Sequence, residues 1–322
     1  MLTAMTSIAF QMDSLAQLNL KFDSTLYLAR AALARGYELF HYEVSKLQME
    51  MRGSNGVSIA ASGHPLSYDL NTEQWILGEA QVRELKSFDV VLMRQDPPFD
   101  LGYISATHIL ENLKGTKTRV INDPVGVRNA PEKLLVTTFP QLMPPTLITR
   151  DIKAIETFRS EHKDIIIKPL HGHAGHGIFH LRDGDDNLPA LIETLSAMTN
   201  EPWMIQKFLP IQQMGDKRIV MLDGEPVGCY TRFPAVGDMR GNARVGARTE
   251  KSELTKRDNE ICAILKPVLR ERGLFLAGID VIGDYLTEIN VTSPTGLIVA
   301  DQFAGRTGKD TIPEKFWQKI FS

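Results

Sequence analysis

The stretch LAGIDVIGDYLTEINVTSPT, residues 276–295, decides how the rest of the chain is interpreted. Residues 276–282 are an apolar run rich in β-branched side chains, and residues 285–291 are a second run of the same kind. Gly283 and Asp284 separate the two runs, and two residues of this type are typical of a tight hairpin turn. The pattern therefore predicts a β-hairpin.

Three side chains that can supply oxygen ligands lie on this predicted hairpin. Asp280 is on the first strand, and Glu288 and Asn290 are on the second. Because side chains alternate between the faces of a strand, Glu288 and Asn290 share a face. If the register places Asp280 opposite them, the three side chains form a site for Mg²⁺, which prefers hard oxygen ligands. The alternative is a surface hairpin with ordinary polar residues, although the apolar neighbours argue against full exposure.

Composition limits the class of protein. The 322 residues are enough for two or three domains, and 43% hydrophobic with 23% charged residues is typical of a soluble globular chain. A net charge of −3 gives no general attraction to nucleic acid or to an anionic membrane. Two cysteines, Cys229 and Cys262, are too few for a disulfide framework, and neither a membrane helix nor a signal peptide is recognisable. We therefore expect a cytoplasmic protein without nucleic-acid or membrane partners.

The N-terminal region reads as a β-α-β unit. A strand is expected at residues 7–12, a helix capped by Asp23 and ended by Gly36, and a second strand at 37–42. This order favours a parallel sheet covered by helices. Residues 50–75 show little periodicity, and we expect turns there, marked by Gly53, Asn55, Gly56, Gly63 and Pro65.

Polar residues follow the next predicted strand, residues 88–93. Arg94 and Asp96 come directly after it. Ligands of open α/β sheets bind beyond the carboxyl ends of the strands, so both residues are site candidates. A surface ion pair beside the rigid Pro97–Pro98 turn is an equally good interpretation.

A glycine-rich turn lies in the middle of the chain. An apolar strand, residues 164–169, contains Lys168 near its end, the sequence HGHAGHG occupies 171–177, and another strand is expected at 178–181. Glycine lets backbone N–H groups approach phosphate oxygens closely, so the turn is predicted to be a flap with Lys168 as a phosphate-binding cation. His171, His173 and His176 could chelate zinc, but we favour a mobile loop because no further ligand cluster lies nearby in sequence.

The last third of the chain contains a predicted nucleotide-binding strand and a basic loop. Residues 203–210 form an apolar strand whose end could bind an adenine edge or could simply belong to the core. A hairpin is expected around Asp223-Gly224, with Arg218 on its first strand. Residues 233–249 lack periodicity, which suggests a lid. The arginines in or beside this loop, suited to carboxylates and phosphates, are Arg232, Arg240, Arg244 and Arg248.

Several blocks of sequence, in order, resemble the ATP-grasp superfamily and, within it, the bacterial glutathione synthetases. The resemblance covers nearly the whole chain from about Met5. Its most specific blocks are MRQDPPFD at 93–100, IKPL at 167–170, GDKRIVMLDGEPV at 215–227, RGNARVG at 240–246, LTKRD at 254–258 and AGIDVIGDYLTEINVTSPTG at 277–296. The resemblance implies an α/β chain with an ATP-grasp fold and three domains. These are an N-terminal parallel-sheet substrate domain (1–124), a central lid domain (125–204) and a C-terminal antiparallel-sheet catalytic domain (205–322).

The resemblance also implies roles for individual residues. Asp280, Glu288 and Asn290 would bind Mg²⁺, or Mn²⁺ in its place. The residues expected to hold ATP are Lys133, Lys168, Gly172, Gly175, Gly177, Gln206, Lys207, Phe208 and Leu209. The residues expected to handle the peptide or its acyl-phosphate are Arg218, Arg232, Arg240 and Ser293. A homotetramer is implied as well.

The implied reaction joins γ-glutamylcysteine to glycine. The peptide carboxylate would attack the γ-phosphate of ATP, and the glycine amine would attack the resulting acyl-phosphate, giving glutathione, ADP and phosphate. This reaction needs cations that neutralise the charge on the phosphoryl group. It does not need a covalent nucleophile on the enzyme. Two alternatives remain: another ATP-grasp carboxylate–amine ligase, and a non-catalytic nucleotide-binding protein, against which the intact acidic set argues.

Overall fold

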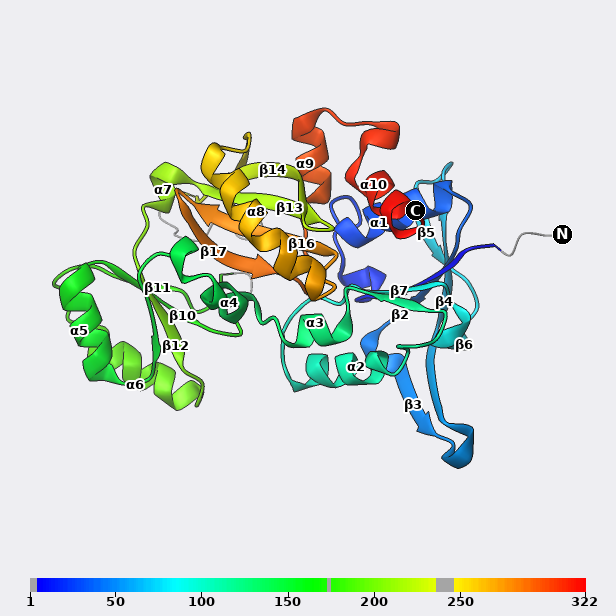
Figure 1. The fold of residues 1–322 in the computed structure, drawn as a ribbon, viewed down its shortest axis with the longest axis horizontal. Helices are drawn as coiled ribbons and strands as arrows, with labels where there is room; N and C mark the ends of the chain where they lie inside the picture. The colour runs from blue at the N-terminus through cyan, green and yellow to red at the C-terminus, as the bar shows by residue number, and fades with distance from the viewer. Residues whose placement is uncertain (1–4, 173–174, 236–245) are drawn as a thin grey trace.

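The chain folds around three β-sheets, which a computed structural model describes for residues 5–172, 175–235 and 246–322. The N-terminal sheet lies at one end of the molecule, the sheet of residues 146–207 forms a lobe at the other, and the C-terminal sheet lies between and above them (Figure 1). None of the helices in these residues is long and apolar enough to span a membrane.

The centre of the N-terminal sheet is parallel, as the β-α-β pattern predicts. Its parallel strands, in spatial order, are β2 (Glu38–Tyr42), β1 (Ser7–Gln11), β7 (Val90–Met93) and β8 (Arg119–Ile121). Helix α1 (Ser24–Ala34) begins where Asp23 accepts a hydrogen bond from Leu26 N, and α2 is Leu101–Glu111. β1 is buried along its whole length, which explains why its three central residues, Ile8, Ala9 and Phe10, are all apolar.

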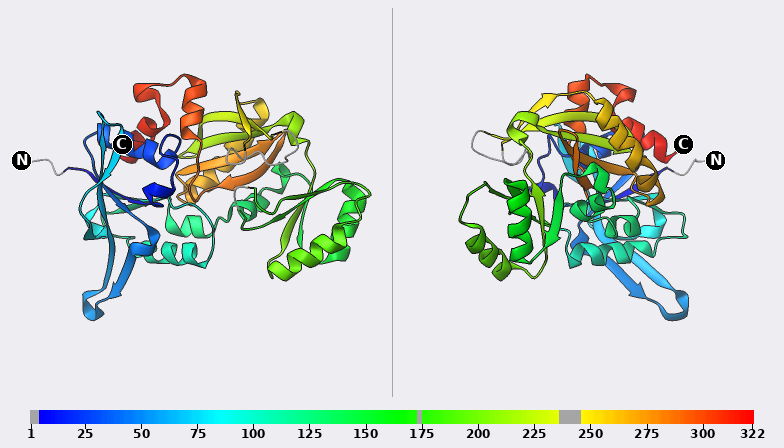
Figure 2. Two further views of the ribbon diagram at one scale, coloured as in Figure 1. Left: turned by 180° about the vertical axis from the view of Figure 1, so that it is seen from behind. Right: turned by 60° about the vertical axis from the view of Figure 1, so that its left-hand side comes forward.

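Antiparallel strands extend this sheet through the region where the sequence predicted turns. They are β3 (Leu47–Met51), β4 (Val57–Asp69), β5 (Gln74–Leu77) and β6 (Gln81–Glu84). The turns predicted at Gly63 and Pro65 are wrong, because both residues lie inside β4. Gly63 is needed for close approach, since a Cβ there would lie 2.2 Å from the carbonyl oxygen of His41. The β3–β4 hairpin projects from the body of the molecule (Figure 2).

The lobe is an antiparallel sheet covered by two helices. Its strands, in spatial order, are β11 (Phe179–Leu181), β10 (Ile165–Pro169), β12 (Trp203–Lys207) and β9 (Thr146–Thr149). Helices α5 (Ile152–His162) and α6 (Leu188–Met198) pack on it around the buried Trp203. The boundary that we drew at 204/205 falls within β12, and β9 was not predicted.

The C-terminal sheet is antiparallel and contains the predicted hairpins. Its strands, in spatial order, are β15 (Arg248–Lys251), β14 (Glu225–Phe233), β13 (Asp216–Leu222), β16 (Leu276–Ile282) and β17 (Tyr285–Asn290). Helix α8 (Lys256–Glu271) begins with a capping box formed by Thr255 and Asp258. The other helices described are α3 (Pro124–Arg128), α4 (Glu132–Leu135), α7 (Ile211–Met214), α9 (Leu297–Ala304), which was not predicted, and α10 (Ile312–Ile320).

Buried hydrogen bonds join the N-terminal part of the chain to the C-terminal part. Asn122, which follows β8, donates to the carbonyl oxygens of Leu276 and Val291, at 2.8 Å each, and accepts from Leu276 N at 2.8 Å. Helix α10 returns to α1, where Trp317 Nε1 donates to Leu28 O at 2.8 Å. The two sheets are therefore fixed to each other by satisfied buried polar groups.

Candidate active site

A cavity of about 880 Å³ lies where the three sheets meet. Its wall includes all the described residues to which the family resemblance assigned a role, except Gly177. These are Lys133, Lys168, Gly172, Gly175, Gln206, Lys207, Phe208, Leu209, Arg218, Arg232, Asp280, Glu288, Asn290 and Ser293. Arg240 and Arg244 lie outside the described residues. Of the rest of the predicted lid, Phe233 ends β14, and Arg248 and Thr249 begin β15.

The register of the β16–β17 hairpin brings the three predicted metal ligands together. Asp280 is paired with Glu288, and Gly278 with Asn290. Asn290 Nδ2 donates to Asp280 Oδ2 at 3.1 Å, which leaves the amide oxygen as the atom that could serve as a ligand. Two carboxylates and an amide on one face of a hairpin are a donor set that fits a hard divalent cation.

Asp280 is also the centre of an arginine cluster, by which we mean Arg218, Arg232, Asp216 and Asp280. Arg218 donates from Nε to Asp280 Oδ1 at 2.6 Å and from Nη2 to Oδ2 at 3.1 Å, and Arg232 Nη2 lies 2.8 Å from Oδ1. Burial by itself would raise the pKa of Asp280, but Arg218 and Arg232 lower it to about 2. Asp280 is therefore ionised at neutral pH.

Asp216 completes this cluster and was missed by the sequence analysis as a site residue. It is paired across β13 and β14 with Arg232 and forms an ion pair with its guanidinium group. Burial raises the pKa of Asp216 to about 7; Arg232 opposes the shift and the negative charge of Asp280 adds to it. Its position two residues before Arg218, on the same face of one strand, was the signal that could have identified it.

A second group of charges, the lysine pair, faces the cavity from the other side. Lys168 comes from β10 and Lys133 from α4, and their Nζ atoms lie 3.8 and 3.6 Å from the same oxygen of Glu288. Both lysines are almost fully buried. Burial lowers the pKa of Lys168 to about 8, with Lys133 adding to the shift and Glu288 opposing it. Two cations share one carboxylate, so this side carries an excess of positive charge.

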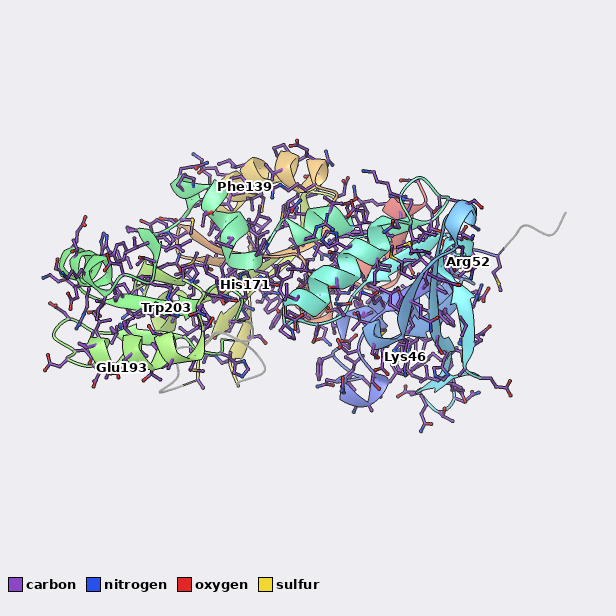
Figure 3. The ribbon with its side chains drawn as sticks, turned by 90° about the horizontal axis from the view of Figure 1, so that it is seen from below. Lys46, Arg52, Phe139, His171, Glu193 and Trp203 are labelled. Carbon is purple, nitrogen blue, oxygen red and sulfur yellow. The ribbon has the colours of Figure 1, made fainter. Side chains whose placement is uncertain are left out.

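The glycine-rich turn begins beside the lysine pair. Lys133 Nζ donates to the carbonyl oxygen of Gly172, and the ring of His171 stacks on Phe99, with ring centroids 6.2 Å apart. His171 lies at the junction between the lobe and the rest of the molecule (Figure 3). His173, which belongs to the zinc alternative, lies outside the described residues. Elsewhere in the described ranges, no three His, Cys, Asp or Glu side chains are arranged to hold a metal ion.

The predicted adenine segment consists of the last two residues of β12, Gln206 and Lys207, and the next two, Phe208 and Leu209, all on the cavity wall. Gln206 Nε2 donates to Thr146 Oγ1 at 3.0 Å. The backbone N–H groups of Lys207 and Phe208 already donate to Pro145 O and Asp164 O, at 3.0 and 2.9 Å. Within the described residues, the N–H of Leu209 has no such partner, so it is a backbone donor that this segment can offer to a ligand.

Carboxylates that the sequence analysis did not select also line the cavity. Glu132, next to Lys133, accepts from Thr292 Oγ1 at 3.0 Å, and burial together with Glu288 raises its pKa to about 7. Asp13 accepts from Asp96 N at 2.8 Å at the N-terminal end of the cavity. Asp96 therefore lines the cavity, as the position after β7 suggested, whereas Arg94 lies behind the wall.

Comparison with known families covers both halves of the chain. Residues 6–128 match the model of the N-terminal domain of prokaryotic glutathione synthetase, and residues 132–305 match that of its ATP-grasp domain. The chain belongs to the prokaryotic glutathione synthetase family. Family membership confirms the ATP-grasp fold and the ATP-dependent ligase class expected from the sequence.

Individual members of the family are similar over nearly their full length. The glutathione synthetase of Brucella melitensis is 48% identical over 313 residues, which is 97% of each chain. The glutathione synthetase of Synechocystis is 41% identical over 315 residues, or 95% of this chain and 97% of the relative.

Solved structures with lower identity share the fold. D-cycloserine synthetase DcsG superposes with a TM-score of 0.68 at 13% identity, over 98% of both chains. D-alanyl-alanine synthetase A from Vibrio cholerae gives a TM-score of 0.61 at 14% identity, over 99% of this chain and 98% of that one. At these identities the likeness concerns the fold alone.

Proposed function

We propose that this chain joins γ-glutamylcysteine to glycine at the expense of ATP, giving glutathione, ADP and phosphate, in the cavity between the three sheets. The observation that carries the proposal is the arrangement of charge in the cavity of a member of this family. The lysine pair has surplus positive charge for a triphosphate, and the arginine cluster offers guanidinium groups for a carboxylate.

ATP would lie along the lobe side of the cavity. Lys133 and Lys168 are placed to contact its phosphates, because they are buried and, among the described residues, both form their ion pair with the same carboxylate, that of Glu288. Gly172, Gly175 and Gly177 belong to the flap that would cover the phosphates, and Gly175 and Gly177 have positive φ angles of 77° and 70°. The segment Gln206, Lys207, Phe208 and Leu209 would hold the adenine, with the Leu209 N–H as donor.

Asp280, Glu288 and Asn290 would hold Mg²⁺ or Mn²⁺. When bound, such an ion neutralises phosphate charge and orients the triphosphate. The donor set fits, but four N–H groups already approach the two oxygens of Asp280: two from Arg218, one from Arg232 and one from Asn290. Since an ionised carboxylate has about four acceptor positions, ion binding at Asp280 requires at least one of these donors to turn away.

The peptide carboxylate would be bound by Arg218 and Arg232, with Ser293 and Arg240 as further contacts. An oxygen of this carboxylate attacks the γ-phosphorus, the bond to the β-phosphate oxygen breaks, and ADP leaves. The glycine nitrogen, as the free amine, then attacks the acyl carbon and loses one proton to the departing phosphate, while the C–O bond to that phosphate breaks. The arginines and lysines hold the negative charge throughout, and the cavity wall limits access of water to the acyl-phosphate.

The decisive experiment is phosphate release by the purified protein with ATP, Mg²⁺ and a panel of carboxylate and amine substrates. We expect release only when γ-glutamylcysteine and glycine are both present, with glutathione identified by mass spectrometry. Release with another pair would assign the chain to a different ATP-grasp carboxylate–amine ligase activity. No release with any pair would favour a nucleotide-binding protein without catalysis.

Three further properties are proposed on the basis of family membership. We propose a homotetramer in the cytoplasm, and domains at residues 1–124, 125–204 and 205–322. Light scattering after size-exclusion chromatography tests the tetramer, and cell fractionation tests the compartment. Limited proteolysis tests the domain boundaries. Cleavage is expected near residue 124 and, because Met204 is buried inside β12, at the exposed residues Asn200 and Glu201 before that strand.

A further inference from the structure

The segment from Thr292 to Leu297, which we call the Ser293 loop, connects β17 to α9. Residues 292–296 of this loop line the cavity. Pro294 is buried, Ser293 is half-buried, and the loop contacts both the N-terminal and the C-terminal sheets through hydrogen bonds of its backbone. The position of the Ser293 side chain in the cavity therefore depends on what holds this backbone.

Arg94 holds the loop from the side of the N-terminal sheet. It follows β7, is only 5% exposed and does not line the cavity. Its Nε donates to Thr25 Oγ1 and its Nη2 to the carbonyl oxygen of Pro294, both at 3.0 Å. Burial lowers the pKa of Arg94, and the nearby Asp23 and Asp96 oppose the shift. This buried cation thus joins the first turn of α1 to Pro294, which lies 200 residues after Arg94 in the sequence.

Other anchors hold the rest of the loop. Arg218 Nη1 donates to Thr295 O at 3.2 Å from the C-terminal sheet. Ser24 Oγ accepts from the N–H groups of Gly296 and Leu297 at 3.1 and 3.4 Å. Two consecutive carbonyl oxygens are therefore each held by a buried guanidinium group, one from each sheet. Charged hydrogen bonds in a buried setting are strong and directional, so the loop has one defined position.

We propose that Arg94 is a positioning residue for the peptide substrate: by fixing the Pro294 carbonyl, it sets where Ser293 meets the carboxylate-bearing peptide, without touching that peptide itself. The inference deepens the proposed function and rests on it. Arg94 has no contact with the lysine pair or with residues 206–209 among the described contacts, so it acts on peptide binding and leaves nucleotide binding unchanged.

The test is a comparison of Michaelis constants in the full-length enzyme. Arg94→Met removes both donors while keeping an unbranched side chain, and we expect KM for γ-glutamylcysteine to rise by about tenfold, since a hydrogen bond to a charged group contributes this much or more. KM for ATP should stay unchanged. The lysine of Arg94→Lys can reach Pro294 O or Thr25 Oγ1 but not both. Its KM for the peptide should therefore lie between those of the wild type and Arg94→Met.

Two additional variants separate positioning from simple stabilisation. Thr25→Val removes the acceptor of the Arg94 Nε hydrogen bond and should raise KM for the peptide by less than Arg94→Met does. This variant also tests the proposal if Arg94→Met does not fold. Arg35→Met is the matched control, because Arg35 joins α1 to Glu314 of α10, at 2.7 Å, away from the cavity. We expect a lower Tm for this variant without any change in KM.

The proposal is overturned if Arg94→Met lowers Tm and leaves KM for γ-glutamylcysteine unchanged. If Arg94→Met does not fold, the same result in both single variants, Arg94→Lys and Thr25→Val, overturns it. It is also overturned if the KM values for ATP and peptide rise together. Calorimetric titration of γ-glutamylcysteine without ATP gives an independent readout, with the same tenfold weakening expected for Arg94→Met. If the wild-type enzyme does not use γ-glutamylcysteine, it is the proposed function that fails, and this outcome is distinct from a failure of the Arg94 variants.

Discussion

The arginine cluster and the lysine pair face the same cavity but are paired to different degrees. In the cluster, two arginines meet two carboxylates, and the contacts to Asp280 are 2.6 to 3.1 Å long. In the lysine pair, two ammonium groups share one oxygen of Glu288 at 3.6 and 3.8 Å. The cluster thus has one carboxyl group for each arginine and is well ordered, whereas the lysine pair has two cations for the single carboxylate of Glu288. The difference indicates that the lysine side attracts the triphosphate, and that the arginine side is organised before any substrate binds.

The largest expected effect comes from the residue at the centre of the cluster. Asp280→Asn should lower turnover by about a thousandfold, because it removes a metal ligand and leaves Arg218 and Arg232 less well paired. The same change should lower the free energy of unfolding by about 3–5 kcal/mol, since it removes one partner of a buried ion pair. Activity assays and urea unfolding measure the two effects.

Glu288→Gln is the matched control for Asp280→Asn. We expect a comparable loss of turnover but a much smaller loss of stability, because the lysines lie farther from Glu288 and its side chain is 24% exposed. Equal destabilisation by the two variants would contradict the difference between the arginine cluster and the lysine pair.

The next largest effect is expected from removing the positive charge of the lysine pair. Lys133→Met and Lys168→Met should each raise KM for ATP by about tenfold, since each removes a charged contact to phosphate. KM for γ-glutamylcysteine should change little. Steady-state kinetics with each substrate varied in turn measure both KM values. If only KM for γ-glutamylcysteine rises, the triphosphate does not bind on the lysine side of the cavity.

A smaller effect is expected from pH. The pKa of Lys168 is lowered to about 8 by burial and by Lys133, so its ammonium group loses a proton as pH rises through 8. We expect kcat/KM for ATP to decline above about pH 8 in the wild-type enzyme. In Lys168→Arg, whose side chain stays charged, the decline should move to higher pH. An identical profile in both enzymes would remove Lys168 from this role.

The smallest effect tests the buried carboxylate of the cluster. Because the pKa of Asp216 is raised to about 7, the folded protein keeps a proton that the unfolded chain releases from about pH 4 upward. The stability contributed by this group therefore falls as pH rises from about 4 to 7. Relative to the wild type, Asp216→Asn should gain stability over the same interval, as measured by urea unfolding at several pH values. A pH-independent difference would mean that the pKa of Asp216 is ordinary.

Local pattern was enough to predict the elements that carry most of the candidate site. The β16–β17 hairpin, the strand containing Lys168 and the hairpin containing Arg218 all have short-range signals: apolar runs, two-residue turns and alternation. The same reasoning failed at Gly63 and Pro65, where a glycine and a proline were interpreted as turn residues. There Gly63 serves the close approach of β2 to β4, and Pro65 is tolerated within the strand.

The amino-acid sequence by itself determined which oxygen and nitrogen side chains are available and which of them share a strand face, since these follow from period and turn chemistry. Only the tertiary structure decided their partners. Asp216 with Arg232, Glu288 with two lysines, Asn122 with Leu276 and Arg94 with Pro294 are pairs between separate strands, loops or sheets. Such pairs form because a buried charge or amide is stable only beside a complementary group, and packing decides which group that is. No local sequence pattern encodes how far along the chain the partner lies.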